Sequence, residues 1–230
     1  ENLLMAACLA SGITVIENAS VEPEVVDLAD FLCAMGARIQ GAGTSTIRIE
    51  GVRRLHGAVY RVMPDRMEAG TFALAAAITG GRVVIEDSVS LWLGALTNKL
   101  VEAGVEVTAT PQYYEVAAGE ALRATNIQTY PYPGFPTDLQ APYATLMTQA
   151  TGASTIYETM YDGRLEYAET LRHMGAEIDL PSGRMAVVHG PTLLHGCDVR
   201  ALDIRSGAAM VLAALAAEGT TRIDNVVYID

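Results

Sequence analysis

The stretch GITVIEN (residues 12–18) decides the fold of this chain, because it recurs three more times. Its counterparts are GRVVIED (81–87), GASTIYE (152–158) and GTTRIDN (219–225). The first glycines of the four copies are 69, 71 and 67 positions apart. Each copy joins an initial glycine to a mostly β-branched run with a polar end, which is typical of a short strand that follows a turn.

A second motif repeats in the same frame. MGARI (35–39), AGVEV (103–107) and MGAEI (174–178) have glycines that are 68 and 71 positions apart. Two independent motifs that share a period of about 70 residues indicate one folding unit that is used several times.

Local patterns predict the elements of the repeat unit. Helix formers fill residues 2–11, and apolar residues recur with a helical period over 23–35. A strand at 13–17 separates these two helices. Two alternating segments, 37–40 and 46–50, follow them and are joined by a glycine-rich loop, which predicts a hairpin.

The second unit adds a strand at 58–63 before its first helix, so we predict that the complete unit is β-α-β-α-β-β. The other predicted elements are helix 66–79, strand 126–130, helix 138–151, strand 154–158, helix 164–174, hairpin 176–189, strand 198–201, helix 205–218 and strand 221–226. Alternating helices and strands predict an α/β fold with parallel strand pairs. The first helix of each unit, such as 69–78 or 208–217, is apolar on nearly every face. We therefore expect these helices inside, with the sheets around them.

The composition favours a globular protein and argues against two classes of partner. Half of the 230 residues are hydrophobic and only 18% are charged, so a large core is available. The net charge of −12 argues against binding to nucleic acid or to an anionic membrane, because both require a basic surface. The longest apolar run, 207–217, is too short to span a bilayer, and we identify no signal peptide.

The cysteines and histidines show no pattern of a metal site. The three cysteines are scattered and form no CxxC pair, which argues against zinc or a disulfide framework and favours a reducing, cytoplasmic location. The four histidines lack metal-ligand spacing, so we predict neither a metal nor a cofactor. The GAG segment at 41–43 is not followed by a helix, which favours a hairpin loop over a nucleotide-binding loop.

Three polar turns stand at the start of the buried helices. They carry Asp65, Asp138 and Asp203, which are 73 and 65 positions apart, and Arg66 and Arg205 lie beside two of them. A helix N-terminus offers unpaired N–H groups and partial positive charge, so several such turns with arginines would bind phosphate or carboxylate. Each aspartate also suits a purely structural role as a helix N-cap. Both interpretations stay open at this point.

At these turns the chain resembles the enolpyruvyl transferases, and the likeness runs over its whole length. The segments that carry it are VEPEVVD (21–27), YRVMPDRMEAGTF (60–72), FPTDLQA (135–141) and ALDIR (201–205). The resemblance implies an inside-out α/β barrel with two domains of three units each and an active site in the cleft between them. Residues 1–63 would be the last unit of the first domain, and residues 64–230 would be most of the second domain.

The resemblance also implies the reaction. The enolpyruvyl group of phosphoenolpyruvate would pass to the 3′-hydroxyl of UDP-N-acetylglucosamine with release of phosphate, the first committed step of peptidoglycan synthesis. Asp138 matches the position that takes the proton from that hydroxyl, and Arg205 matches one that contacts phosphoenolpyruvate. Asp203 would orient the neighbouring cationic groups. The residues expected to bind the substrates would further include Tyr161, Arg164, Glu22, Asp65 and Arg66.

The chain also departs from the family pattern. The amino-terminal Lys-Asn pair, the mobile loop that carries a general acid, usually cysteine, and an arginine after the final strand are absent. The sequence starts at Glu1 without a methionine and stops at Asp230 in mid-unit, so we expect a fragment that is inactive by itself. Two alternatives stay open. One is a 3-phosphoshikimate 1-carboxyvinyltransferase, with a shikimate acceptor, and the other is a non-catalytic repeat scaffold.

Overall fold

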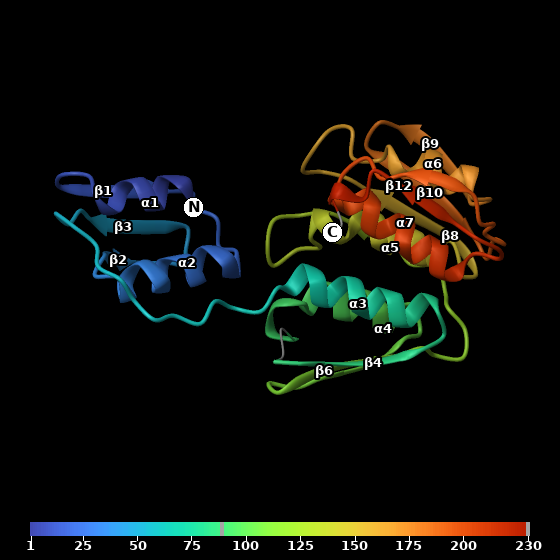
Figure 1. The fold of residues 1–230 in the computed structure, drawn as a ribbon, viewed down its shortest axis with the longest axis horizontal. Helices are drawn as coiled ribbons and strands as arrows, with labels where there is room; N and C mark the ends of the chain where they lie inside the picture. The colour runs from blue at the N-terminus through green and yellow to red at the C-terminus, as the bar shows by residue number, and fades with distance from the viewer. Residues whose placement is uncertain (88–89, 229–230) are drawn as a thin grey trace. The chain divides into compact units, whose positions relative to one another are not determined.

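The computed structural model describes residues 1–87 and 90–228, and the chain divides into two compact bodies (Figure 1). The first body is Glu1–Pro64 and the second is Asp65–Asp230.

The first body is a three-stranded sheet that packs against two helices. The helices are α1 (Asn2–Cys8) and α2 (Pro23–Ala34), and the strands are β1 (Ile13–Glu17), β2 (Arg38–Gln40) and β3 (Thr46–Glu50). The central strand, β3, pairs antiparallel with both neighbours. The core consists of buried side chains from the helices and the sheet, among them Leu4, Cys8, Val25, Leu32, Ile47 and Ile49. The predicted order of helix, strand, helix and hairpin is confirmed.

The leading strand predicted at 58–63 is wrong. No strand is assigned there, and among the described residues β4 pairs only with β6. The segment lies instead against α2. The Tyr60 hydroxyl donates to Asp27 Oδ1 at 2.9 Å, the Met63 N–H donates to the same oxygen at 3.2 Å, and the Tyr60 ring packs on Phe31. Because these contacts hold the segment on a helix face, the second repeat unit lacks its first strand.

The second body contains the later repeat units in chain order. The second unit comprises α3 (Arg66–Ile78), β4 (Arg82–Glu86), η1 (Ser90–Trp92), α4 (Gly94–Glu102), β5 (Glu106–Ala109) and β6 (Tyr113–Ala117). The third comprises β7 (Ile127–Gln128), η2 (Thr137–Leu139), α5 (Gln140–Met147), β8 (Gly152–Tyr157), α6 (Tyr167–His173), β9 (Glu177–Ser182) and β10 (Met185–Gly190). The fourth comprises β11 (Asp198–Arg200), α7 (Ile204–Ala216), β12 (Arg222–Asp224) and η3 (Val226–Tyr228).

The sheets of the second body repeat one pairing scheme. Their strand orders are β4-β6-β5, β7-β8-β10-β9 and β11-β12. The leading strands β7 and β11 pair parallel with β8 and β12, which follow the first helix of the same unit. The hairpin strands pair antiparallel. The parallel strand pair predicted for the unit is therefore confirmed in the third and fourth copies.

Three helices form the centre of the second body. α3, α5 and α7 contact one another, and the sheets contact α3 and α5 (Figure 1). All eight residues of α5 are buried. Close approach of α3 and η2 depends on Gly70, because a Cβ there would lie 2.5 Å from Leu139 Cδ1. The prediction that the apolar first helices lie inside is confirmed for α5, whereas α3 exposes Phe72 and α7 exposes Val211 and Leu215, so these two helices are inside on only part of their surface.

The helix predicted at 2–11 ends earlier, at Cys8, and two predicted helices that adjoin the site also have boundaries that differ from the prediction. The helix predicted at 138–151 is the turn η2 followed by α5, which ends at Met147, and the helix predicted at 164–174 starts at Tyr167. Gly163 has a φ of +75°, a left-handed conformation that interrupts regular backbone and leaves residues 162–166 as a turn.

Candidate active site

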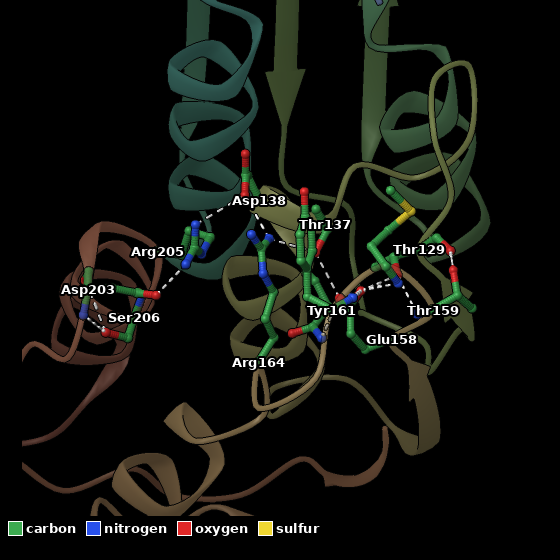
Figure 2. Close-up of polar contacts among 12 residues, drawn as sticks. Thr129, Thr137, Asp138, Glu158, Thr159, Tyr161, Arg164, Asp203, Arg205 and Ser206 are labelled. Carbon is green, nitrogen blue, oxygen red and sulfur yellow. Dashed lines mark hydrogen bonds and ion pairs between the residues drawn. The ribbon is translucent and has the colours of Figure 1, made fainter. Parts of the chain in front are cut away.

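Asp138 lies between two arginines from different elements. It belongs to η2, and its Oδ1 lies 2.9 Å from Arg164 Nη1 and 3.5 Å from Arg205 Nη1 (Figure 2). Arg164 comes from the turn before α6, and Arg205 comes from the first turn of α7. The third and fourth repeat units thus bring one carboxylate and two guanidinium groups together. The Asp138 side chain is 48% exposed, so a ligand can reach its carboxylate.

Asp203 combines the two roles that its sequence position left open. Its Oδ1 accepts the Ser206 N–H at 2.8 Å, and the Ser206 hydroxyl accepts the Asp203 N–H, a capping box at the start of α7. Its Oδ2 lies 2.5 Å from Arg205 Nη2. Burial pushes the pKa of Asp203 upward, but the Ser206 N–H and the Arg205 guanidinium outweigh burial and hold the pKa below its ordinary value. Asp203 therefore caps α7 and fixes Arg205.

Tyr161 and Arg164 lie on the same turn and contact each other. The Arg164 guanidinium carbon lies 4.0 Å from the centre of the Tyr161 ring, which is cation–π geometry. Arg164 Nη1 also donates to Thr137 Oγ1 at 2.8 Å. Tyr161 is half exposed, whereas the Arg164 side chain is only 18% exposed. Arg164 is therefore held by a ring, a hydroxyl and a carboxylate.

A cavity of about 250 Å³ is lined by both arginines that contact Asp138, although Asp138 itself is not among the lining residues. Its wall includes Thr137, Tyr161, Arg164, Asp203 and Arg205, with the first turn of α5 behind them. Two guanidinium groups in one wall suit an anionic ligand, because each presents several N–H donors in a plane. The site thus combines an accessible carboxylate with groups that bind phosphate or carboxylate.

Asp65 and Arg66 do not line this cavity. Asp65 caps α3, because its Oδ1 accepts the backbone N–H groups of Met67 and Glu68 at 2.7 and 3.1 Å. Arg66 is buried, and its guanidinium lies over the Tyr132 ring, 5.4 Å from the centroid. Tyr132 precedes η2 in the chain, so Arg66 supports the segment that leads to Asp138. The capping interpretation fits Asp65.

Glu22 belongs to the first body, where it precedes α2. Its Oε2 accepts the Ser20 hydroxyl at 2.7 Å, and its side chain makes no capping hydrogen bond to the helix. These local contacts do not test its predicted part in substrate binding, which stays a prediction.

Sequence reasoning missed Glu158 as a residue of interest. Its side chain is fully buried beside the cavity, and it accepts hydrogen bonds from Thr129, Thr137, Gln140 and the backbone of Met160 and Tyr161 (Figure 2). A signal was present in the sequence. Glu158 ends the third copy of the repeated motif, where the other copies have Asn18, Asp87 and Asn225.

Neither a metal site nor a membrane span is found in the described ranges, 1–87 and 90–228. No three His, Cys, Asp or Glu side chains there are grouped so that they could hold a metal ion. No helix in the same ranges has the length and apolar character needed to cross a membrane.

The fold consists of repeated units around buried helices, and its polar turns bring aspartates and arginines together. The sequence of the chain also matches a known family. Residues 1–230 match the EPSP synthase (3-phosphoshikimate 1-carboxyvinyltransferase) family, and the chain belongs to it. The chain is 50% identical to UDP-N-acetylglucosamine 1-carboxyvinyltransferase 1 of Caldanaerobacter subterraneus subsp. tengcongensis over 230 residues. That match covers 100% of this chain and 55% of the relative.

Solved structures of the same kind are similar to the chain. The enolpyruvyl transferase NikO from Streptomyces tendae superimposes with a TM-score of 0.88 at 27% identity, over 98% of this chain and 54% of that protein. EPSP synthase from Acinetobacter baumannii superimposes with a TM-score of 0.69 at 21% identity, over 99% of this chain and 56% of that protein, which shows the shared fold alone. The chain thus spans about half the length of the relatives that it matches.

Proposed function

We propose that this chain is part of a protein that transfers the enolpyruvyl group of phosphoenolpyruvate to the 3′-hydroxyl of UDP-N-acetylglucosamine, with release of phosphate. The observation that carries the proposal is the placement of Asp138 between Arg164 and Arg205, which both line one cavity. The 50% identity to a UDP-N-acetylglucosamine 1-carboxyvinyltransferase supports this choice of acceptor.

The chemistry assigns Asp138 the role of general base. Deprotonation of a sugar hydroxyl requires a carboxylate within hydrogen-bond reach of the proton, and the half-exposed Asp138 stands beside the cavity on a fixed turn. One of the two neighbouring guanidinium groups must shift its hydrogen bond with the carboxylate when the hydroxyl binds. Arg205 makes the longer of the two contacts, at 3.5 Å against 2.9 Å for Arg164, and both are drawn as dashed lines in Figure 2.

Arg205 binds the anionic donor substrate in this proposal. A guanidinium has five N–H donors, and the contacts with Asp138 and Asp203 use two of its nitrogens. The planar fork matches a carboxylate or a phosphate, which phosphoenolpyruvate carries together. Asp203 keeps the fork in place. Arg164 and Tyr161 contribute to the sugar-nucleotide side. Glu22, Asp65 and Arg66 stay predicted substrate-binding residues, although Asp65 and Arg66 do not line the cavity.

The fold of the whole protein is proposed on the same basis. Residues 1–63 form the last repeat unit of a first domain, and residues 64–230 form most of a second domain. The full architecture is an inside-out α/β barrel, supported by the helices α3, α5 and α7 at the centre of the second body. The amino-terminal Lys-Asn pair and the loop with the general acid, which the family pattern includes, are not found in residues 1–230.

The proposed reaction places the protein in the cytoplasm, at the first committed step of peptidoglycan biosynthesis. It thereby connects the protein to cell-wall formation, cell shape and cell division. The reaction needs no cofactor beyond its two substrates.

The test measures phosphate release from phosphoenolpyruvate by the full-length protein with each acceptor in turn. We expect release with UDP-N-acetylglucosamine and none with shikimate 3-phosphate. Release with shikimate 3-phosphate alone would assign the protein to the activity after which the family is named. Asp138→Asn keeps the shape of the side chain and should nearly abolish release, because an amide cannot act as the base. Unchanged release in this variant would require another base.

A further inference from the structure

Glu158 occupies a position at which the repeat units otherwise follow one rule. In the other three copies the last residue of the motif is Asn18, Asp87 or Asn225, and each has a positive φ, of 54, 54 and 64°. Asn and Asp tolerate this left-handed conformation better than other residues with side chains. Glu158 does not have a positive φ. The first, second and fourth units therefore use this position for its left-handed backbone, whereas the third unit uses it for a side chain.

The carboxylate of Glu158 is fully buried and fully engaged. Its Oε1 accepts from the Thr129 hydroxyl at 2.9 Å and from the N–H groups of Met160 and Tyr161 at 2.7 and 3.1 Å. Its Oε2 accepts from the Thr137 hydroxyl at 2.8 Å and from Gln140 Nε2 at 3.2 Å. Within the described part of the chain no Lys, Arg or His nitrogen lies within 4.0 Å of this carboxylate.

Burying a carboxylate in this way costs free energy of folding, and a core that only had to be well packed would not need one. An ionised carboxylate without a direct counterion loses its hydration on burial, and a well-packed apolar side chain often serves stability as well or better. Here five donors from three segments replace the lost water. The segments are the end of β7, the η2–α5 junction and the turn that carries Tyr161 and Arg164. The carboxylate thus connects the η2–α5 junction with the turn that carries Tyr161 and Arg164, the two segments that form the candidate site.

The hydrogen-bond directions lead from Glu158 to the proposed base. Because a carboxylate only accepts, the Thr137 hydroxyl hydrogen points toward Glu158, and a lone pair of the same oxygen remains for Arg164 Nη1 at 2.8 Å. Arg164 Nη1 is also 2.9 Å from Asp138 Oδ1. The second arm runs through the backbone N–H groups of residues 160 and 161, which fix the start of the turn that presents Arg164 (Figure 2).

We propose that Glu158 is a positioning residue of the transfer reaction: through Thr137 and through the turn at 160–164 it fixes Arg164 against Asp138. Glu158 does not touch substrate, because it is 0% exposed and does not line the cavity. This role rests on the proposed function of Asp138 and Arg164.

The first test is Glu158→Gln in the full-length protein. The variant keeps the size of the side chain but turns one acceptor oxygen into a donating amide, so the Thr137 hydroxyl can no longer be oriented as before. We expect kcat to fall about tenfold to a hundredfold with little change in KM for phosphoenolpyruvate, together with a lower unfolding temperature because the buried amide N–H then faces another donor. Wild-type kcat would overturn the proposal. Glu169→Gln is the matched control, because this exposed carboxylate pairs with Arg172 on α6, and its kcat should not change.

The second test separates positioning from a general loss of structure. Thr137→Val removes the relaying hydroxyl and should lower kcat as Glu158→Gln does, whereas Thr137→Ser keeps the hydroxyl and should retain kcat near the wild-type value. Because both residues act through one path, the double variant Glu158→Gln/Thr137→Val should be no slower than the slower single variant. If the double variant instead shows the product of the two single losses of kcat, the proposed path from Glu158 through Thr137 is wrong. If Glu158→Gln fails to fold, the comparison of Thr137→Val with Thr137→Ser decides the same question.

A third measurement keeps this inference apart from the proposed function. If the wild-type protein transfers nothing to UDP-N-acetylglucosamine, the proposed function fails, and a crystal structure of Glu158→Gln still tests the positioning role. The expected result is loss of the contact between Arg164 Nη1 and Asp138 Oδ1. An unchanged contact in that variant would overturn the role of Glu158.

Discussion

Asp203 and Arg205 are joined by a contact of 2.5 Å between Oδ2 and Nη2, while the other oxygen of Asp203 caps the helix that carries both residues. The start of α7 therefore fixes its own guanidinium group. This pairing lets one acidic residue serve the stability of the helix and the geometry of the cavity together, and each of these contributions can be measured separately.

The pH dependence of stability should report the charge of Asp203. Its pKa in the folded protein lies below the ordinary value of 3.8, so its stabilising charge is fully present above pH 3.8 and is lost as the pH falls through the lowered pKa. Asp203→Asn keeps a side-chain oxygen for the cap but removes the charge. In thermal unfolding, the wild type should be more stable than the variant at pH 6, and the difference should shrink below pH 3.8. A difference that does not vary with pH would contradict this account.

Arg205→Lys should weaken the use of phosphoenolpyruvate. Lysine keeps the positive charge but cannot span Asp203 and an anion with a planar fork. We expect kcat/KM for phosphoenolpyruvate to fall about tenfold to a hundredfold in steady-state kinetics of the full-length protein. Arg222→Lys is the control, because this exposed arginine of β12 pairs with Asp224 and should tolerate the change. Equal losses of kcat/KM in Arg205→Lys and Arg222→Lys would show that Arg205 has no special role.

The ring of Tyr161 should matter more than its hydroxyl. Tyr161→Phe keeps the aromatic face over Arg164, whereas Tyr161→Leu removes it. An exposed cation–π contact contributes about 0.5–1 kcal/mol. If the ring holds Arg164 in place for the ligand, this is the largest loss expected, so the leucine variant should bind UDP-N-acetylglucosamine up to about two- to fivefold more weakly. Isothermal titration on the full-length protein measures both dissociation constants. Weaker binding by the phenylalanine variant would show instead that the hydroxyl contacts the ligand.

Gly70 should be intolerant of a larger side chain. A Cβ at this position would lie 2.5 Å from Leu139 Cδ1 and 3.2 Å from Leu96 Cδ2, so Gly70→Val forces buried side chains apart. Such overpacking costs about 1–3 kcal/mol of unfolding free energy. Gly94→Val is a matched control, because Gly94 is also helical but a Cβ there would meet no atom within 4 Å. Denaturant unfolding should therefore show the larger loss for Gly70→Val, and equal losses would exclude packing as the cause.

Local patterns predicted most elements of the fold because their signals are strong and short in range. The glycine followed by a β-branched run located β1 and β4, and the glycine-rich loop located the hairpin of β2 and β3. The pattern at 58–63 also favoured a strand, but the structure of this segment depends on which part of the protein it packs against. Asp27 and Phe31 on α2 bind the segment, and no local rule contains that tertiary choice.

The candidate site was predicted unevenly for a related reason. Asp138, Asp203 and Arg205 could be found because polar residues recur in register before the buried helices, whereas Asp65 shares the register but serves as a cap. Arg164 was expected at the site only from the family resemblance, because a helical pattern conceals the left-handed turn at Gly163 beside it. Glu158 acquires its importance only when three distant segments meet around it. A comparison of the four motif copies with one another would have singled it out.

The complete burial of α5 has a consequence for the timescale on which the site can open. Asp138 belongs to η2, which continues directly into this helix, and all eight residues of α5 lack an exposed face. Amide hydrogens in such an element exchange with solvent only when the surrounding body unfolds. The backbone of η2, which carries the proposed base, therefore continues directly into slowly exchanging structure, and this turn is anchored at its C-terminal end before any ligand arrives.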